Sequence, residues 1–406
     1  MNAVWAAAEK VYRSGIHPAI QICVRREGEV ILQRAIGHAS GNGPRDTPDT
    51  PKVAVTPSTP FNLFSASKAV TAMLIHLLDE RHLVHLNDPV CEYIPEFGCK
   101  KKQWITIQHV LSHRAGIPNL PREAMQLERL EDPRSIVQML CDSEPVWRPG
   151  RDLAYHAISG GFILAEIVER VTGKGIDVLL QKEIQRPLGL RGMRYGVRPA
   201  EVKKVAVNYV TGPPALPPIS TLLTRALGVP FEEATRISND PRFLTSVIPS
   251  GNVVATADEA CRFYQLLLNG GELDGVRIFQ PRTIRRALTE QSYLEFDLTL
   301  GVPLRYGLGF MLGGKWFSLY GPDTQEAFGH LGFTNIFTWA DPERQVAGAI
   351  LTNGKPLIYP ELYYLWDFMR QIGRACPKVK RRSKKAAVAA KARPGPTKIV
   401  ARRAAR

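Results

Sequence analysis

The sequence lacks long apolar runs: no stretch approaches the ~18 uninterrupted apolar residues that a membrane-spanning helix needs. Residues 1–14 mix apolar side chains with Glu9, Lys10 and Arg13, so they also lack the continuous apolar core of a secretion signal. We interpret this segment as an amphipathic first helix of the folded domain. The sequence therefore predicts no transmembrane segment and a cytoplasmic location.

Several signatures of enzyme and metal sites are also missing. There is no G-x-S-x-G nucleophile elbow, no G-x-x-x-x-G-K-[ST] phosphate loop and no H-E-x-x-H zinc motif. The six cysteines form no C-x-x-C pair and show no paired spacing with histidine. In a chain of this length we expect them to be small buried apolar residues and not a disulfide framework. We expect no structural metal and no cofactor.

Acidic residues are absent from the last part of the chain, although the whole sequence carries a net charge of +15. Residues 377–406 contain twelve lysines and arginines, which leaves a net charge of only +3 for residues 1–376. With hardly any large apolar residue, this segment is expected to be a disordered basic tail. Its charge would attract polyanions weakly, such as nucleic acid or an acidic surface; the alternative is a solvated tail with no specific partner.

The folded part begins and ends with strand patterns and has helical patterns in between. Residues 19–36 predict a β-hairpin with a polar turn at Gly28. Thr256 and Glu259 predict a capping box before a helix. Further helices are expected over 61–82, 158–171 (ended by Gly173) and 257–269, and further strands over 306–313, 333–340 and 346–353.

These patterns favour an α+β fold, in which one antiparallel sheet contains the first and last segments and is flanked by helices. We expect one catalytic domain over residues 1–376. Within it, a sheet subdomain would comprise about 1–85 and 245–376, and a mostly helical subdomain about 86–244. A cleft between the two subdomains is a common place for an active site.

The most informative motif is Ser65-Ala66-Ser67-Lys68, an S-x-x-K spacing near the start of an apolar helix. Residues three apart share one face of a helix, so the lysine amine can reach the serine hydroxyl. A serine hydroxyl is a weak nucleophile until a base takes its proton. A lysine can be that base when burial or nearby positive charge lowers its pKa. The spacing alone is common, but a surface lysine is less expected on an otherwise apolar helix.

Two more motifs follow in order along the chain: Pro149-Gly150-Arg151-Asp152-Leu153-Ala154-Tyr155 and Gly329-His330-Leu331-Gly332-Phe333. With S-x-x-K they make an ordered set that resembles the serine β-lactamase and penicillin-binding-protein superfamily, and in particular its class C β-lactamase-related carboxylesterase branch. Residues 106–118, 250–258 and 306–310 resemble further segments of that branch. The resemblance covers roughly residues 10–370.

The resemblance implies a role for each matched residue. Ser65 would attack an acyl carbonyl, Lys68 would take or relay its proton, and Tyr155 would share the base role and protonate the leaving group. The backbone N–H groups of Ser65 and Phe333 would form the oxyanion hole. His330 and Gly332 would line the substrate site. His109 and His113 are interpreted as structural residues.

The sequence departs from the β-lactamase pattern at two places. Ala157 stands where an asparagine usually follows the tyrosine, and it cannot hydrogen-bond the amide of a β-lactam side chain. His330-Leu331-Gly332 replaces Lys-Thr-Gly, which removes a permanent cation and a hydroxyl donor. Both changes weaken recognition of an anionic amide antibiotic and favour a neutral ester.

Three hypotheses about function therefore stay open. The first is a serine hydrolase that cleaves carboxylic esters through a Ser65 acyl-enzyme. The second keeps the fold and the acyl-enzyme but makes the protein a β-lactamase, a D-amino-acid peptidase or an acyltransferase. The third is a non-catalytic binding or scaffold protein, against which the presence of Ser65, Lys68 and Tyr155 argues. The expected partner is a small-molecule ester or amide substrate.

Overall fold

The computed structural model describes residues 1–379 apart from 121–125, 215, 218, 317 and 358–361. Its largest sheet contains β1 (Ala19–Arg26), β2 (Glu29–Ser40), β3 (Val53–Ala54), β10 (Ser292–Asp297), β11 (Val302–Tyr306), β12 (Met311–Leu312), β13 (Phe328–Gly332), β14 (Ile336–Asp341) and β15 (Val346–Thr352). Shorter strands are β4 (Phe61–Asn62), β5 (Arg194–Tyr195), β6 (Tyr209–Val210), β7 (Val253–Ala255), β8 (Glu272–Leu273), β9 (Val276–Arg277) and β16 (Gly354–Lys355).

The α-helices are α1 (Asn2–Arg13), α2 (Ser67–Glu80), α3 (Ile107–Leu111), α4 (Pro133–Asp142), α5 (Ser159–Thr172), α6 (Ile176–Leu180), α7 (Ile219–Leu227), α8 (Phe231–Ile237), α9 (Pro241–Thr245), α10 (Ala257–Leu268), α11 (Pro281–Ala287) and α12 (Leu362–Ala375). Short 3-10 helices are η1 (Phe64–Ala66), η2 (Val90–Glu92), η3 (Pro95–Gly98), η5 (Leu127–Glu131) and η7 (Pro199–Lys204), and η6 (Gln181–Gln185) is a π-helical turn.

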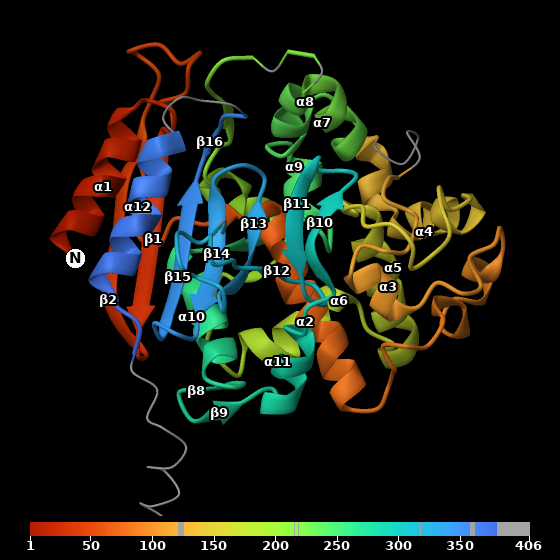
Figure 1. The fold of residues 1–406 in the computed structure, drawn as a ribbon. Helices are drawn as coiled ribbons and strands as arrows, with labels where there is room; N and C mark the ends of the chain where they lie inside the picture. Colours follow the sequence, from red (N-terminus) through yellow and green to blue (C-terminus); the bar gives the residue numbers. More distant parts are fainter. Residues whose placement is uncertain (121–125, 215, 218, 317, 358–361, 380–406) are drawn as a thin grey trace, which may run out of the picture.

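The large sheet is antiparallel throughout, in the order β10-β11-β12-β13-β14-β15-β1-β2-β3. Strand β1 lies between its hairpin partner β2 and β15, near the other end of the described chain, with Ile22 opposite Ile350. The first and last segments therefore share one sheet, as the sequence predicted. Figure 1 shows α1 and α12 stacked on one face of the sheet and α10 on the other, which confirms the α+β fold.

Alternation along β1 explains this layering, because successive side chains of a strand point to opposite faces. Ile20, Ile22 and Val24 are buried in the apolar cluster with α1 and α12, whereas Ala19 and Cys23 belong to the cluster with α2 and α10. Helix α2 is buried along almost its whole length, as expected for a helix with apolar residues on all sides. Within the mostly helical region, residues 90–245, helices α3, α4 and α5 lie beside the β10 end of the sheet (Figure 1), whereas β6 pairs with β16.

Several local predictions are confirmed. Helix α5 ends at Gly173, whose φ of +65° is the left-handed conformation that glycine adopts at helix ends. Helix α10 begins with the predicted capping box: Thr256 Oγ1 accepts from the Glu259 backbone N–H at 3.2 Å, and Glu259 Oε2 accepts from the Thr256 N–H at 3.0 Å.

Three predicted boundaries are wrong. The segment 61–82 is not one helix, because Phe61–Asn62 pair with β7 and α2 begins only at Ser67. The predicted strand 306–313 is interrupted between β11 and β12, where Gly309 packs against Ala72. The predicted strand 333–340 combines a turn with β14 and omits β13, which contains two glycines that lower strand propensity.

The chain continues beyond Cys376 in contact with the folded body. Lys378 Nζ lies 2.7 Å from Asp323 Oδ1 and 2.9 Å from Glu343 Oε2, and the Val379 N–H donates to the Glu343 carbonyl at 2.8 Å. Residues 377–379 therefore pack on the body, and the rest of the predicted basic tail, 380–406, lies outside the described residues. Within the described residues, no helix combines the length and apolar character that crossing a membrane requires.

Candidate active site

Ser65 lies in η1, the 3-10 turn that leads directly into α2. Two bonds to β7 hold this segment: the Leu63 N–H donates to the Val253 carbonyl at 2.8 Å, and the Val253 N–H donates to Ser67 Oγ at 2.9 Å. Phe64, immediately before the serine, has a φ of +49°, a conformation that few non-glycine residues adopt. Backbone strain of this kind concentrates at functional sites. The local geometry thus presents Ser65 at a sharp turn.

Lys68 lies one turn further along, and its ammonium reaches the serine. Its Nζ donates to Ser65 Oγ at 3.1 Å, to the Ala157 carbonyl at 2.6 Å and to the Ser250 carbonyl at 3.3 Å. The lysine side chain is buried, and burial lowers its pKa well below the usual value because the charged form loses hydration. The S-x-x-K spacing therefore produces the predicted contact between the two side chains.

Tyr155 is brought to the same point from a segment without regular structure that precedes α5. Lys68 Nζ lies 4.6 Å from the centroid of its ring. Burial raises the pKa of the phenol, and its hydrogen bond with Ser65 opposes that rise. Tyr155 is thus a neutral phenol in contact with both Ser65 and Lys68.

Strand β13, which contains His330 and Gly332, lies beside these residues, with the His330 ring centroid 6.1 Å from that of Tyr155. A Cβ at Gly332 would lie 2.5 Å from the Leu63 carbonyl oxygen, so the absence of a side chain lets β13 approach the turn that contains Ser65. Phe333 follows directly, with its ring centroid 5.4 Å from that of Phe64. The structure therefore brings Ser65, Lys68, Tyr155, His330, Gly332 and Phe333 to one place.

The imidazoles of the site are uncharged near neutral pH. Burial, reinforced by the nearby Lys68, lowers the pKa of His330 to about 3, and its Nδ1 lies 2.7 Å from the Leu331 carbonyl oxygen. Burial also lowers the pKa of His156 to about 4 and holds the pKa of His113 well below its usual value. His330 therefore provides no cation where a lysine would provide one.

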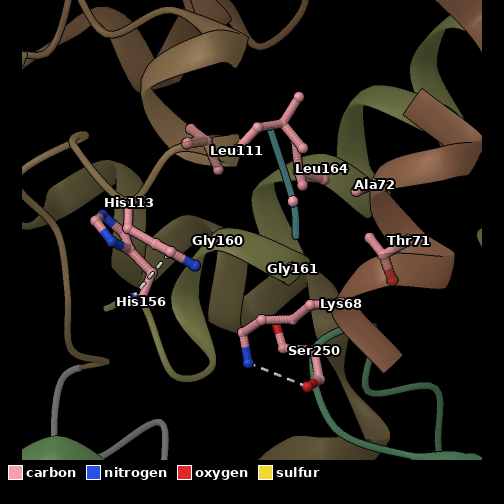
Figure 2. Close-up of a pocket in the computed structure, with 12 residues that line it drawn as sticks. Lys68, Thr71, Ala72, Leu111, His113, His156, Gly160, Gly161, Leu164 and Ser250 are labelled. Carbon is pink, nitrogen blue, oxygen red and sulfur yellow. Dashed lines mark hydrogen bonds between the residues drawn. The ribbon is translucent and has the colours of Figure 1, made fainter. Parts of the chain in front are cut away.

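Two cavities border these residues. Figure 2 shows the smaller one, of about 30 Å³, with the imidazoles of His113 and His156 on one side, Leu111 and Leu164 on another, and Lys68 and Ser250 at its base. The larger cavity, of about 120 Å³, opens beside Ser65 and Tyr155. It is lined mainly by apolar side chains, among them Leu120, Leu227, Phe243 and Phe333.

The sequence did not reveal every residue that shapes the site. The carbonyl groups of Ala157 and Ser250 hold the lysine amine, and backbone acceptors leave no signal in residue type. Asp297, buried at the end of β10, accepts the backbone N–H of Tyr155 at 3.1 Å although 142 positions separate the two residues. No motif pointed to Asp297. His113, interpreted from the sequence as structural, packs its ring 4.8 Å from that of Tyr155.

A serine hydroxyl bonded to a buried lysine, a tyrosine beside both, and an apolar pocket next to them define a hydrolase of the β-lactamase and penicillin-binding-protein fold. The chain matches the Beta-lactamase family over residues 7–364, and it belongs to that family.

Similar proteins include enzymes with esterase names. The Esterase/beta-lactamase LipL of Mycobacterium tuberculosis is 31% identical over 302 residues, which cover 72% of this chain and 68% of LipL. The solved structure of a family VIII carboxylesterase is similar at a TM-score of 0.76 and 26% identity, covering 91% of this chain and 96% of that one. A penicillin-binding protein homologue from Caulobacter crescentus has a TM-score of 0.77 at 27% identity, with the same two coverages.

Proposed function

We propose that this protein hydrolyses neutral carboxylic esters through an acyl-enzyme on Ser65. The observation that carries the proposal is the pocket beside Ser65: no lysine or arginine is among the described residues that line it, and most of them are apolar. An anionic substrate would lose its hydration there without a cation in return, whereas an apolar ester loses little. The names of LipL and of the family VIII carboxylesterase agree with an ester substrate.

The contacts of Lys68 suggest how Ser65 is activated. Three oxygen contacts match the three N–H donors of the ammonium form. Once the lysine is neutral, as its lowered pKa favours, the two carbonyl groups keep two donors and the amine lone pair faces the Ser65 hydroxyl. Lys68 then accepts the proton while Ser65 Oγ forms a bond to the ester carbonyl carbon.

The remaining steps use the tyrosine and two backbone groups. The carbonyl electron pair moves onto the oxygen, and the N–H groups of Ser65 and Phe333 stabilise that oxyanion. When the C–O bond breaks, the alcohol leaves with a proton from Tyr155, which regains one from Lys68. Water then attacks the acyl-enzyme by the same route and releases the carboxylic acid and free Ser65.

Intact-protein mass spectrometry after brief exposure to a fluorophosphonate probe tests the nucleophile. We expect one probe mass on the wild type and none on Ser65→Ala. Ser58→Ala is the control, because Ser58 is an exposed serine that lines neither cavity of the site, and it should keep the label. We also expect Ser65→Ala to lose p-nitrophenyl butyrate turnover by several orders of magnitude. If Ser65→Ala is still labelled, or keeps wild-type turnover, then Ser65 is not the nucleophile.

Turnover of nitrocefin beside p-nitrophenyl butyrate tests the substrate class. We expect the ester to be preferred strongly, because Ala157, His330 and Leu331 lack the groups that would hold an anionic β-lactam. The name of LipL, which includes β-lactamase, makes β-lactam hydrolysis the second candidate. A preference for nitrocefin would replace the ester proposal with that candidate.

A further inference from the structure

Three successive backbone N–H groups around Tyr155 are bonded to two buried residues far away in the chain. The His113 carbonyl accepts from the Ala154 N–H at 3.0 Å, and His113 Nδ1 accepts from the His156 N–H at 3.2 Å, the bond that joins these two histidines in Figure 2. Between them, Asp297 Oδ1 accepts from the Tyr155 N–H at 3.1 Å. Because this segment has no regular structure, these bonds take the place of the backbone hydrogen bonds that a helix or a sheet would provide.

His113 is unusual in its backbone and in its packing. Its φ is +61°, a region in which asparagine, aspartate and histidine are enriched among non-glycine residues. Its ring centroid lies 4.8 Å from that of Tyr155 and 5.0 Å from that of Tyr306. Because burial keeps the imidazole neutral, Nδ1 retains the lone pair that accepts from the His156 N–H, and the ring proton is assigned to Nε2.

Asp297 is itself held in place by hydrogen bonds to its carboxylate. Its Oδ1 also accepts from the N–H groups of Thr299 and Leu300, each at 2.9 Å, and its Oδ2 accepts from the Tyr306 hydroxyl at 3.1 Å. The carboxylate is buried, and the hydrogen bonds satisfy both of its oxygens. The backbone of Tyr155 is therefore held from the sheet by Asp297 and from the helical region by His113.

We infer that His113 and Asp297 are positioning residues for the reaction, which set the Tyr155 phenol against Ser65. This inference rests on the proposed function of Ser65, Lys68 and Tyr155. Neither residue is needed for its charge: each acts through the backbone atoms that it holds. A displacement of about 1 Å at a catalytic group can cost ~100-fold in rate, so loosening these bonds reduces turnover while substrate binding in the apolar pocket stays intact.

A pair of His113 variants tests the inference, since glycine and asparagine both tolerate positive φ. His113→Gly removes the Nδ1 acceptor, whereas the amide oxygen of His113→Asn can take its place. On p-nitrophenyl butyrate we expect His113→Gly to lose roughly 10- to 100-fold in kcat with KM changed less than about threefold. We expect His113→Asn to recover kcat to within about threefold of wild type. Circular dichroism and Tm show whether each variant is folded.

The same two substitutions in a Tyr155→Phe background complete the test. If His113 acts through Tyr155, His113→Gly should cost less than about threefold there, because the phenol that it positions is gone. The inference would be overturned if His113→Gly lowered kcat equally in the wild-type and Tyr155→Phe backgrounds. It would also be overturned if His113→Gly kept the wild-type kcat, or if His113→Asn did not recover it. Should His113→Gly fail to fold, Asp297→Ala with its isosteric control Asp297→Asn makes the same comparison from β10, with the same expected loss and recovery.

Tyr155→Phe alone separates this inference from the proposed function. Impaired turnover in Tyr155→Phe together with an unaffected His113→Gly would contradict only the positioning role. Wild-type turnover in Tyr155→Phe would contradict the proposed role of Tyr155, and the positioning role would fall with it.

Discussion

Lys68 and Lys355 are two buried lysines that contact neighbouring residues, Ser65 and Phe64. Lys68 Nζ lies 3.1 Å from Ser65 Oγ, whereas Lys355 Nζ lies 4.9 Å from the centroid of the Phe64 ring and donates to the Thr352 carbonyl at 2.7 Å. Burial lowers the pKa of both, in Lys355 to about 7. The comparison shows that burial makes a lysine available as a base, but only a hydroxyl within reach gives it a proton to take.

The largest expected difference between the two lysines is the effect of their substitution on turnover. Lys68→Met should lower kcat/KM on p-nitrophenyl butyrate by about 10²- to 10⁴-fold, the usual contribution of a general base. Lys355→Met, the matched control, removes a similar buried ammonium and should stay within about fivefold of wild type because Lys355 does not contact the serine hydroxyl. Equal losses in the two variants would break the comparison and show that Lys68 acts through packing alone.

The pH profile sharpens the same contrast. If neutral Lys68 is the base, kcat/KM should rise with pH through the pKa of Lys68 and fall about tenfold per unit below it. His330 and His156, with pKa values of about 3 and 4, are already neutral above pH 5 and add no limb of their own there. Initial rates, followed toward low pH as far as the protein stays folded, measure this limb, and Lys355→Met should retain it. Residual activity of Lys68→Met that keeps the same limb as the wild type would argue against Lys68 as the titrating base.

Lys355 should instead affect stability. Its pKa is lowered on folding, so between about pH 7 and 10 the unfolded chain binds a proton that the folded protein does not. The free energy of unfolding of the wild type, compared with that of Lys355→Met, should therefore rise with pH by on the order of 1 kcal/mol per unit. Urea titrations of both proteins at pH 7, 8.5 and 10 measure this difference. A constant difference would mean that Lys355 titrates normally.

The lysines and arginines at the end of the chain provide the third case, for which we expect the smallest effect. Deleting residues 380–406 removes much of the basic excess without touching any residue of the site, so ester turnover should stay within about twofold of wild type. Truncation after Cys376 also removes Lys378, which bridges Asp323 and Glu343, and we expect a slightly lower Tm with unchanged kcat. A large loss of kcat in the shorter deletion would show that the tail contributes to catalysis.

Much of the fold and part of the site could be predicted from the sequence, because their signals are local. The β-hairpin of residues 19–36, the apolar character of α2 and the capping box of α10 are patterns within a few residues, and all three appear in the structure. The S-x-x-K spacing similarly predicts its own geometry, since three residues of helical turn join Ser65 to Lys68. Strand β13 escaped prediction because its glycines suit close contacts, of Gly332 with Leu63 and of Gly329 with β14, that no local pattern reveals.

The sequence by itself determined which residues can perform the chemistry: a serine, a lysine one turn away, a tyrosine, and a histidine in place of a lysine. Only the tertiary structure decided their ionisation and their alignment. The pKa of Lys68 depends on desolvation by residues from several elements, and the position of Tyr155 depends on His113 and Asp297, which lie 42 and 142 residues away from it. Burial and long-range hydrogen bonds arise only when the chain is packed, so no spacing of residue types records them.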